Sequence, residues 1–183
     1  SCAAGYWGTS VSAESGCGVV GDGYYSASGV NTRSQCGTGA TTNGATTSTD
    51  ASSCICGPGY YGDASTGNDC TACSDASYTA NTYDNGRTGC TVCATGYVGT
   101  ATAQTSNVGC TSCAAGYWGT SVSAESGCDV VGDGYYSPTL DNSRYTCGTY
   151  SNGGSTVTAA YTTPTTTSDD EGDCTCSAGY GGS

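Results

Sequence analysis

Fifteen cysteines lie along 183 residues, and many of them recur at a fixed distance. Three Cys-x-x-Cys pairs follow one another every 20 residues, at Cys70–Cys73, Cys90–Cys93 and Cys110–Cys113. A short period of this kind is typical of stacked modules in which each module contacts only its neighbours. The spacing therefore predicts a repeat array in place of a single globular domain.

A longer repeat encloses the short one. Residues 1–26 and 112–137 are identical except at one position, where Gly18 corresponds to Asp129. The offset between equivalent cysteines is 111 residues at first and 120 residues from Cys174 onward, because the Thr-rich stretch before Cys174 is longer. Insertions of this kind are typical of exposed loops.

The two repeats divide the chain into three predicted parts. Residues 1–70 form a cysteine-rich unit with a Thr-rich loop, residues 71–112 hold two short Cys-x-x-Cys repeats, and residues 113–183 form a second copy of the first unit, truncated at its C-terminus. The chain begins at Ser1 without a signal peptide, and we interpret it as a mature or excised segment of a longer precursor.

Aliphatic residues are too few for an ordinary core. Leu, Ile, Val and Phe together number 13, and the net charge is -12. Such a composition alone favours disorder, but each disulfide restricts the unfolded chain and contributes roughly 2–4 kcal/mol. The predicted fold class is a small disulfide-rich repeat array: an elongated rod of short β-hairpins and loops, with almost no helix and no single hydrophobic core.

The secondary structure is expected to consist of two-stranded hairpins within each disulfide loop. No segment has the apolar periodicity of a helix, and turn-forming residues are abundant. The predicted strand segments are Tyr6–Ser10, Tyr24–Ser26, Tyr60–Gly62, Tyr97–Ala101 and Tyr135–Ser137.

A phrase Cys-x-x-Gly-Tyr recurs five times, beginning at Cys2, Cys56, Cys93, Cys113 and Cys176. The glycine permits a tight turn, and the aromatic residue supplies contact area at little entropic cost. We predict that these aromatic residues pack on disulfides and on the neighbouring module. The predicted packing residues are Tyr6, Trp7, Tyr60, Tyr61, Tyr97, Tyr117, Trp118 and Tyr180. Exposed Tyr and Trp that bind carbohydrate are the alternative interpretation.

Two disulfide pairings fit the cysteine spacing. The sequential scheme joins Cys2–Cys17, Cys36–Cys54, Cys56–Cys70, Cys73–Cys90, Cys93–Cys110, Cys113–Cys128 and Cys147–Cys174. The crossed scheme joins Cys2 to Cys36 and Cys17 to Cys54. Both schemes leave Cys176 unpaired or bonded to another chain, so the count does not decide between them. Zinc or redox chemistry is disfavoured, because the Cys-x-x-Cys units form an even array in a chain without histidine.

The composition excludes several functions. Without His or Lys the chain cannot form a Ser–His–Asp or Cys–His site, a P-loop or a catalytic lysine, and we expect no enzymatic activity and no cofactor. The chain has three arginines and 15 acidic residues, so it cannot neutralise the phosphates of a nucleic acid. No apolar run reaches the roughly 20 residues of a transmembrane helix, so we expect no membrane insertion of this segment.

Acidic residues occur in two settings. Asp22 and Asp133 each lie between two glycines, which is first of all a turn signal, with a calcium contact as the weaker alternative. The segment Asp169–Asp173 is interpreted as a solvated acidic loop, and calcium binding is again the alternative.

Two Thr/Ser tracts, 38–53 and 155–168, are typical of O-glycosylated segments, and no Asn-x-Ser/Thr sequon is present. The candidate O-glycosylation residues are Thr41, Thr42, Thr46, Thr47, Thr162, Thr163, Thr165, Thr166 and Thr167.

Two motifs resemble known families. Cys54-Ile-Cys56-Gly-Pro-Gly-Tyr-Tyr-Gly, with Cys70 after it, resembles the end of an EGF-like module, a family that crosses its first four cysteines. The segment 70–128 resembles ephrin-receptor-like cysteine-rich repeats. Ciliate surface antigens and flagellar-hair (mastigoneme) proteins combine such repeats in Thr/Ser-rich arrays, which implies an extracellular or cell-surface location.

The function that we expect is that of a structural subunit of an extracellular filament or cell-surface fibre. Near-identical modules present near-identical surfaces, and head-to-tail contacts between such surfaces build open assemblies. The expected partners are further copies of the chain and O-linked glycans. The alternatives are a monomeric stalk of an anchored surface antigen and a carbohydrate-binding array that uses Trp7 and Trp118.

Overall fold

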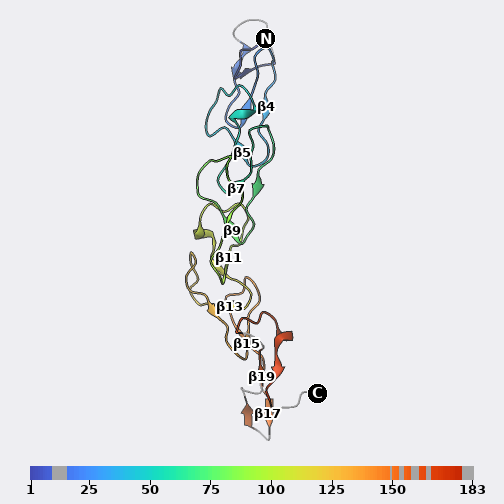
Figure 1. The fold of residues 1–183 in the computed structure, drawn as a ribbon, viewed down its shortest axis with the longest axis vertical. Helices are drawn as coiled ribbons and strands as arrows, with labels where there is room; N and C mark the ends of the chain where they lie inside the picture. The colour runs from blue at the N-terminus through green and yellow to red at the C-terminus, as the bar shows by residue number, and fades with distance from the viewer. Residues whose placement is uncertain (10–15, 149, 153–154, 158–160, 164–165, 179–183) are drawn as a thin grey trace. The chain divides into compact units, whose positions relative to one another are not determined.

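The fold consists of two-stranded β-sheets and loops (Figure 1). The computed structural model describes residues 1–9, 16–148, 150–152, 155–157, 161–163 and 166–178. Within these residues there are ten two-stranded sheets and no α-helix. Three 3-10 turns, Ala51–Ser53, Asn107–Gly109 and Glu171–Asp173, come directly before Cys54, Cys110 and Cys174. This part of the chain is therefore a disulfide-rich β-hairpin repeat array, as the sequence predicts.

Each sheet joins two consecutive strands of the chain, with antiparallel registers such as Tyr6↔Val19 and Trp7↔Gly18. The pairs are β1 (Tyr6–Trp7) with β2 (Gly18–Val19), β3 (Tyr24–Tyr25) with β4 (Ser34–Gln35), β5 (Ala40–Thr41) with β6 (Ile55–Cys56), β7 (Tyr60–Tyr61) with β8 (Thr71–Ala72), β9 (Ser77–Tyr78) with β10 (Thr91–Val92), β11 (Tyr97–Val98) with β12 (Ser112–Cys113), β13 (Tyr117–Trp118) with β14 (Asp129–Val130), β15 (Tyr135–Tyr136) with β16 (Tyr145–Thr146), β17 (Tyr150–Asn152) with β18 (Ser155–Val157), and β19 (Tyr161–Thr162) with β20 (Thr175–Cys176).

A strand begins at the first residue of each of the five predicted segments, but each observed strand is shorter than the predicted segment. Each of these strands has two residues, because the pairing with its partner strand stops after the second one. Ser10, at the end of the first predicted segment, lies outside the described residues.

Seven disulfides join neighbouring cysteines along the chain. The pairs are Cys2–Cys17, Cys36–Cys54, Cys56–Cys70, Cys73–Cys90, Cys93–Cys110, Cys113–Cys128 and Cys147–Cys174. This is the sequential scheme, and the crossed pairing implied by the EGF-like resemblance is not formed. Cys176 carries an exposed free thiol.

Most of the described hairpins do not lie inside the disulfide loops, where they were predicted. In seven of them the first strand lies inside a loop and the second strand comes after the cysteine that closes it, as β2 follows Cys17 and β8 follows Cys70. The hairpins β3–β4 and β15–β16 belong to no disulfide loop, and β17–β18 lies wholly inside the loop closed by Cys147 and Cys174, as predicted. The expectation was wrong for the other hairpins because most disulfides fasten the base of a hairpin and do not enclose it.

Buried cystine takes the place of an aliphatic core. Cys36, Cys54, Cys56, Ala64 and Cys70 form one buried cluster, and the half-buried rings of Tyr25 and Tyr60 pack against it. Tyr60 is one of the predicted packing residues, and Tyr25 was not predicted. Among the remaining predicted residues, Tyr6 is 37% exposed and Tyr180 lies outside the described residues, while the half-buried ones are Trp7, Tyr61, Tyr97, Tyr117 and Trp118. The side chains of Val20 and Val131 are fully buried, although the sequence pattern did not predict these two residues as core.

The glycine of the recurring phrase is required by its backbone. Gly5 has a φ of 78°, and a Cβ there would lie 2.3 Å from the carbonyl oxygen of Thr47. Gly59 has a φ of 82°, and a Cβ there would lie 2.1 Å from the carbonyl oxygen of Ala103. Only glycine tolerates both the left-handed conformation and the close backbone contact.

The chain divides into two compact units, and their boundary runs through the short repeats. Unit 1 comprises residues 1–74, 78–91 and 102–106, and unit 2 comprises residues 75–77, 92–101 and 107–183. No helix in the described part of the chain is long and apolar enough to cross a membrane.

Candidate functional site

Three asparagine side chains accept hydrogen bonds from the backbone N–H groups of three cysteines. Each asparagine lies 29 residues after its cysteine in the sequence. The N–H of Cys2 donates to Oδ1 of Asn31 at 3.1 Å. The equivalent pairs are Cys56–Asn85 at 3.0 Å and Cys113–Asn142 at 2.9 Å. All three cysteines are buried, so each asparagine satisfies a backbone donor that water cannot reach.

An arginine follows each of these asparagines by two residues and supports a second buried segment. Arg33 donates to the carbonyl of Val20 at 2.6 Å, and Arg144 donates to the carbonyl of Val131 at 3.3 Å. Arg87 donates to the carbonyl of Tyr60 at 2.8 Å. All three cations of the chain therefore brace the backbone.

Two of the guanidinium groups also lie over pairs of aromatic rings. The Cζ atom of Arg33 lies 4.4 Å from the centroid of Trp7 and 3.8 Å from that of Tyr24. Arg144 lies 4.1 Å from Trp118 and 4.3 Å from Tyr135. Such cation–π contacts fix the orientation of the rings.

The Asn-x-Arg motif was missed at the sequence level, although a signal was present. Asn31-Thr-Arg33, Asn85-Gly-Arg87 and Asn142-Ser-Arg144 each follow a Cys-x-x-Gly-Tyr cysteine by the same number of residues. From the sequence alone, the arginines were interpreted only as too few to bind nucleic acid.

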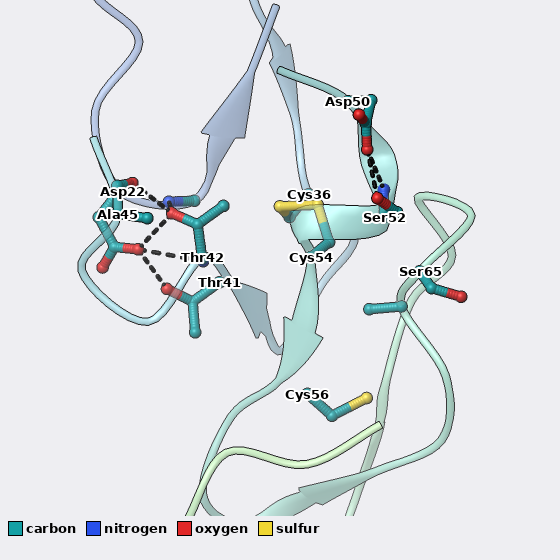
Figure 2. Close-up of a disulfide and its surroundings, with 12 residues drawn as sticks. Asp22, Cys36, Thr41, Thr42, Ala45, Asp50, Ser52, Cys54, Cys56 and Ser65 are labelled. Atoms are coloured by element: carbon teal, nitrogen blue, oxygen red, sulfur yellow. Dashed lines mark hydrogen bonds between the residues drawn. A yellow bond between two sulfur atoms is a disulfide. The ribbon is translucent and has the colours of Figure 1, made fainter. Parts of the chain in front are cut away.

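Asp22 organises the first Thr-rich tract (Figure 2). Its Oδ1 accepts hydrogen bonds from the hydroxyls of Thr41 and Thr42 at 2.6 and 2.9 Å, and from the N–H groups of Thr42 and Gly44 at 3.1 Å. These donors, the Thr41 hydroxyl foremost, lower the pKa of Asp22 from 3.8 to about 2. In the second copy, Asp133 accepts from the N–H of Thr163 at 3.0 Å. Both Asp-Gly motifs thus anchor a Thr-rich loop.

The Thr-rich tracts differ in how accessible their hydroxyls are. Thr46, Thr47, Thr166 and Thr167 are exposed. Thr41 is half-buried, and Thr42 and Thr163 are 5% and 8% exposed. The hydroxyl oxygen of Thr42 lies 2.9 Å from Oδ1 of Asp22 and 2.7 Å from the carbonyl oxygen of Ala45, and its one proton can be donated to either. Thr42 therefore has no room for a glycan, and burial disfavours Thr163 as well. The side chain of Thr162 and the whole of Thr165 lie outside what the structure describes.

The segment Asp169–Asp173 forms a turn before a cysteine. Asp170 accepts from the N–H of Gly172 and caps the 3-10 turn Glu171–Asp173, and Asp173 accepts from the N–H of Asp169 at 3.2 Å. In the first copy, Asp50 caps the turn before Cys54 in the same way, through the N–H of Ser52 (Figure 2). The acidic residues therefore act locally as turn caps.

Two sulfur atoms and one carboxylate come together at Cys93, Cys110 and Glu125, within 4.8 Å of one another. The two sulfurs are bonded to each other and are not thiolates, so the group lacks the donors that a thiolate metal site requires. Glu125 accepts from the N–H of Ala94 at 2.8 Å and from Nδ2 of Asn107 at 3.2 Å. Glu125 therefore links its own repeat, by hydrogen bonds, to the repeat closed by Cys93 and Cys110.

Compared with known proteins, the chain matches no protein-family model and no curated protein. Its own features identify it as a cysteine-rich repeat protein. The seven disulfides indicate an oxidising, extracellular environment and a structural or surface module.

Proposed function

We propose that the chain is a structural, non-catalytic subunit of an extracellular filament or cell-surface fibre. The observation that carries the proposal is the repetition of one set of contacts in two near-identical copies. Asn31 and Asn142 bind equivalent cysteines, and Arg33 and Arg144 brace equivalent valines. A chain that repeats its local structure so closely presents the same surfaces repeatedly, which favours head-to-tail assembly without closure.

The disulfide-fastened hairpins also suit a load-bearing or protective role. Each repeat is closed by its own disulfide, so opening one repeat leaves its neighbours intact. This resistance to unfolding of the whole chain supports a role in a surface coat or filament, of the kind built by the repeat proteins that the sequence resembles.

We further propose that O-linked glycans cover the exposed ends of the Thr-rich tracts. The accessible hydroxyls are those of Thr46 and Thr47 in the first copy and Thr166 and Thr167 in the second. Peptide mass spectrometry of the native protein is expected to find hexose-containing adducts on these residues and an unmodified Thr42. Bare peptides from both tracts would contradict the glycan proposal and leave the filament proposal intact.

Negative-stain electron microscopy of the purified chain, with sedimentation velocity over a concentration series, tests the filament proposal. Filaments of uniform width that lengthen with concentration are the expected result. Dispersed particles with the mass of one chain at every concentration would contradict the proposal and favour the monomeric stalk of a surface antigen.

A further inference from the structure

No disulfide joins or encloses the two strands of the hairpin β15–β16. The hairpin lies between the disulfide loop that Cys128 closes and the loop that begins at Cys147. Its strands pair in the register Tyr135↔Thr146 and Tyr136↔Tyr145. A two-stranded hairpin is at best marginally stable in water, so contacts between its side chains have to hold these strands together.

The rings of Tyr136 and Tyr145 stack across this hairpin. Their centroids are 5.5 Å apart and their planes differ by 29°. The two residues lie directly opposite each other in the strand register, so their proximity is built into the local pairing. Tyr145 is 42% exposed and Tyr136 is half-buried. An oxidant in solution therefore reaches one ring of the pair directly.

A carboxylate is hydrogen-bonded to the exposed phenol of this pair. The hydroxyl of Tyr145 donates to Oδ2 of Asp141 at 2.5 Å. This hydroxyl foremost, with the N–H of Ser143, lowers the pKa of Asp141, so the carboxylate is ionised at neutral pH. The same hydrogen bond raises the pKa of Tyr145, so the phenol keeps its proton until an electron is removed. A phenol that loses an electron becomes a strong acid, and Asp141 is placed to take up its proton.

We propose that Tyr136 and Tyr145 are the site of a dityrosine cross-link, formed with a haem peroxidase and hydrogen peroxide as the oxidant. Each phenol loses one electron and its hydroxyl proton, which gives two tyrosyl radicals. The radicals combine in a bond between one Cε atom of each ring, and the hydrogen on each of these carbons moves to the phenol oxygen. The pair loses two hydrogen atoms in all, and one hydrogen peroxide is reduced to two waters.

The cross-link gives this hairpin the covalent closure that it lacks. It restricts the unfolded chain in the way that a disulfide does, and the paired positions of the two rings make the coupling intramolecular. The equivalent hairpin of the first copy lacks the same groups. There Tyr25 pairs with Ser34, and Val30 stands at the position of Asp141. The modification is independent of the filament proposal.

The test treats the full disulfide-bonded chain, at low concentration, with a haem peroxidase and hydrogen peroxide. The exposed thiol of Cys176 is alkylated beforehand, so that it forms no disulfide with a second chain. The expected product is a monomer that has lost two hydrogen atoms by intact mass and shows the blue fluorescence of dityrosine. Proteolysis of this product is expected to release a peptide in which Tyr136 is joined to Tyr145.

Two phenylalanine variants show whether the pair itself reacts. Tyr145→Phe keeps a ring on the stack but removes the hydroxyl, and it is expected to abolish the cross-linked peptide. Tyr83→Phe is the matched control, because Tyr83 is exposed to a similar extent, 45%, and lies in no strand. This control is expected to form the cross-link to the same yield as the wild type.

Asp141→Asn separates the carboxylate from the ring stacking. Asparagine keeps an oxygen for the N–H of Ser143 but takes up no proton, so the yield after a fixed exposure is expected to fall at least about tenfold. Undiminished cross-linking of this variant would overturn the part assigned to the carboxylate. Dityrosine that joins two chains or another pair of tyrosines, or a wild-type chain that keeps all its tyrosines unmodified, would overturn the inference as a whole.

Discussion

The side chain of Asn85 connects two cysteines that belong to different disulfides. Its Oδ1 accepts from the N–H of Cys56 at 3.0 Å, and its Nδ2 donates to the carbonyl of Cys54 at 2.8 Å. Cys54 is bonded to Cys36 and Cys56 to Cys70, so one amide group bridges consecutive disulfide loops. In this chain, hydrogen bonds from polar side chains do much of what apolar packing does between modules of other proteins.

Replacing Asn85 by alanine is therefore expected to destabilise the chain. The N–H of the fully buried Cys56 would lose its partner, which costs about 1–3 kcal/mol of the free energy of unfolding. Denaturant titration with the disulfides intact measures the loss. Asn81→Ala, at an exposed position in the same unit, is the control and should change stability by less than about 0.5 kcal/mol. Equal effects of the two variants would contradict the bridging role.

A methyl group at Gly59 is expected to be poorly tolerated. Its Cβ would lie 2.1 Å from the carbonyl oxygen of Ala103 and would sit on a residue with a φ of 82°. Strain of this kind costs about 1–3 kcal/mol, before the backbone contact is counted. Gly89→Ala is the control, because nothing lies within 4 Å of its added Cβ. Circular dichroism during thermal unfolding measures both variants, and an unchanged melting temperature for Gly59→Ala would contradict the prediction.

The regular parts of the fold could be predicted from the sequence, because they repeat. In the four Cys-x-x-Gly phrases that the structure describes, the following strand begins at the expected tyrosine, and each disulfide joins neighbours in one of the two schemes that the spacing allows. The Asn-x-Arg motif could not be interpreted in the same way, since Asn85 and its partner Cys56 are 29 residues apart and only the folded chain brings them together. Asp22 likewise looked like a turn residue, and its contact with Thr41 depends on a loop 19 residues away.

The stacking of Arg33 on two rings predicts a spectroscopic change. Arg33→Gln removes the cation that lies 4.4 Å from Trp7, and with it the hydrogen bond to the buried carbonyl of Val20. We expect a shift in tryptophan emission and a loss of about 1 kcal/mol of stability. Arg87→Gln is the matched control: among the described residues no aromatic ring lies under Arg87, so tryptophan emission should stay unchanged. Identical emission from the wild type and Arg33→Gln would rule out the stacked arrangement.

The sequential disulfides predict a defined set of cross-linked peptides and one free thiol. Proteolysis without reduction should release Cys2 joined to Cys17 and Cys36 joined to Cys54. The exposed thiol of Cys176 should react with an aromatic disulfide reagent in the native protein, and Cys176→Ser should abolish that reaction. A peptide that joins Cys2 to Cys36 would show that the crossed pairing is the real one.

The hydrogen bonds to Asp22 predict that acid weakens the first Thr-rich loop. Donors from Thr41, Thr42 and Gly44 lower the pKa of this carboxyl to about 2 in the folded chain, from 3.8. Because the folded pKa is the lower one, the stabilisation is present above pH 3.8 and is lost as the pH falls towards 2. Asp22→Asn removes the charge, so the stability difference between wild type and variant should shrink over that window. Side-chain carboxyl chemical shifts followed by NMR would contradict the prediction if Asp22 titrates at its ordinary pKa.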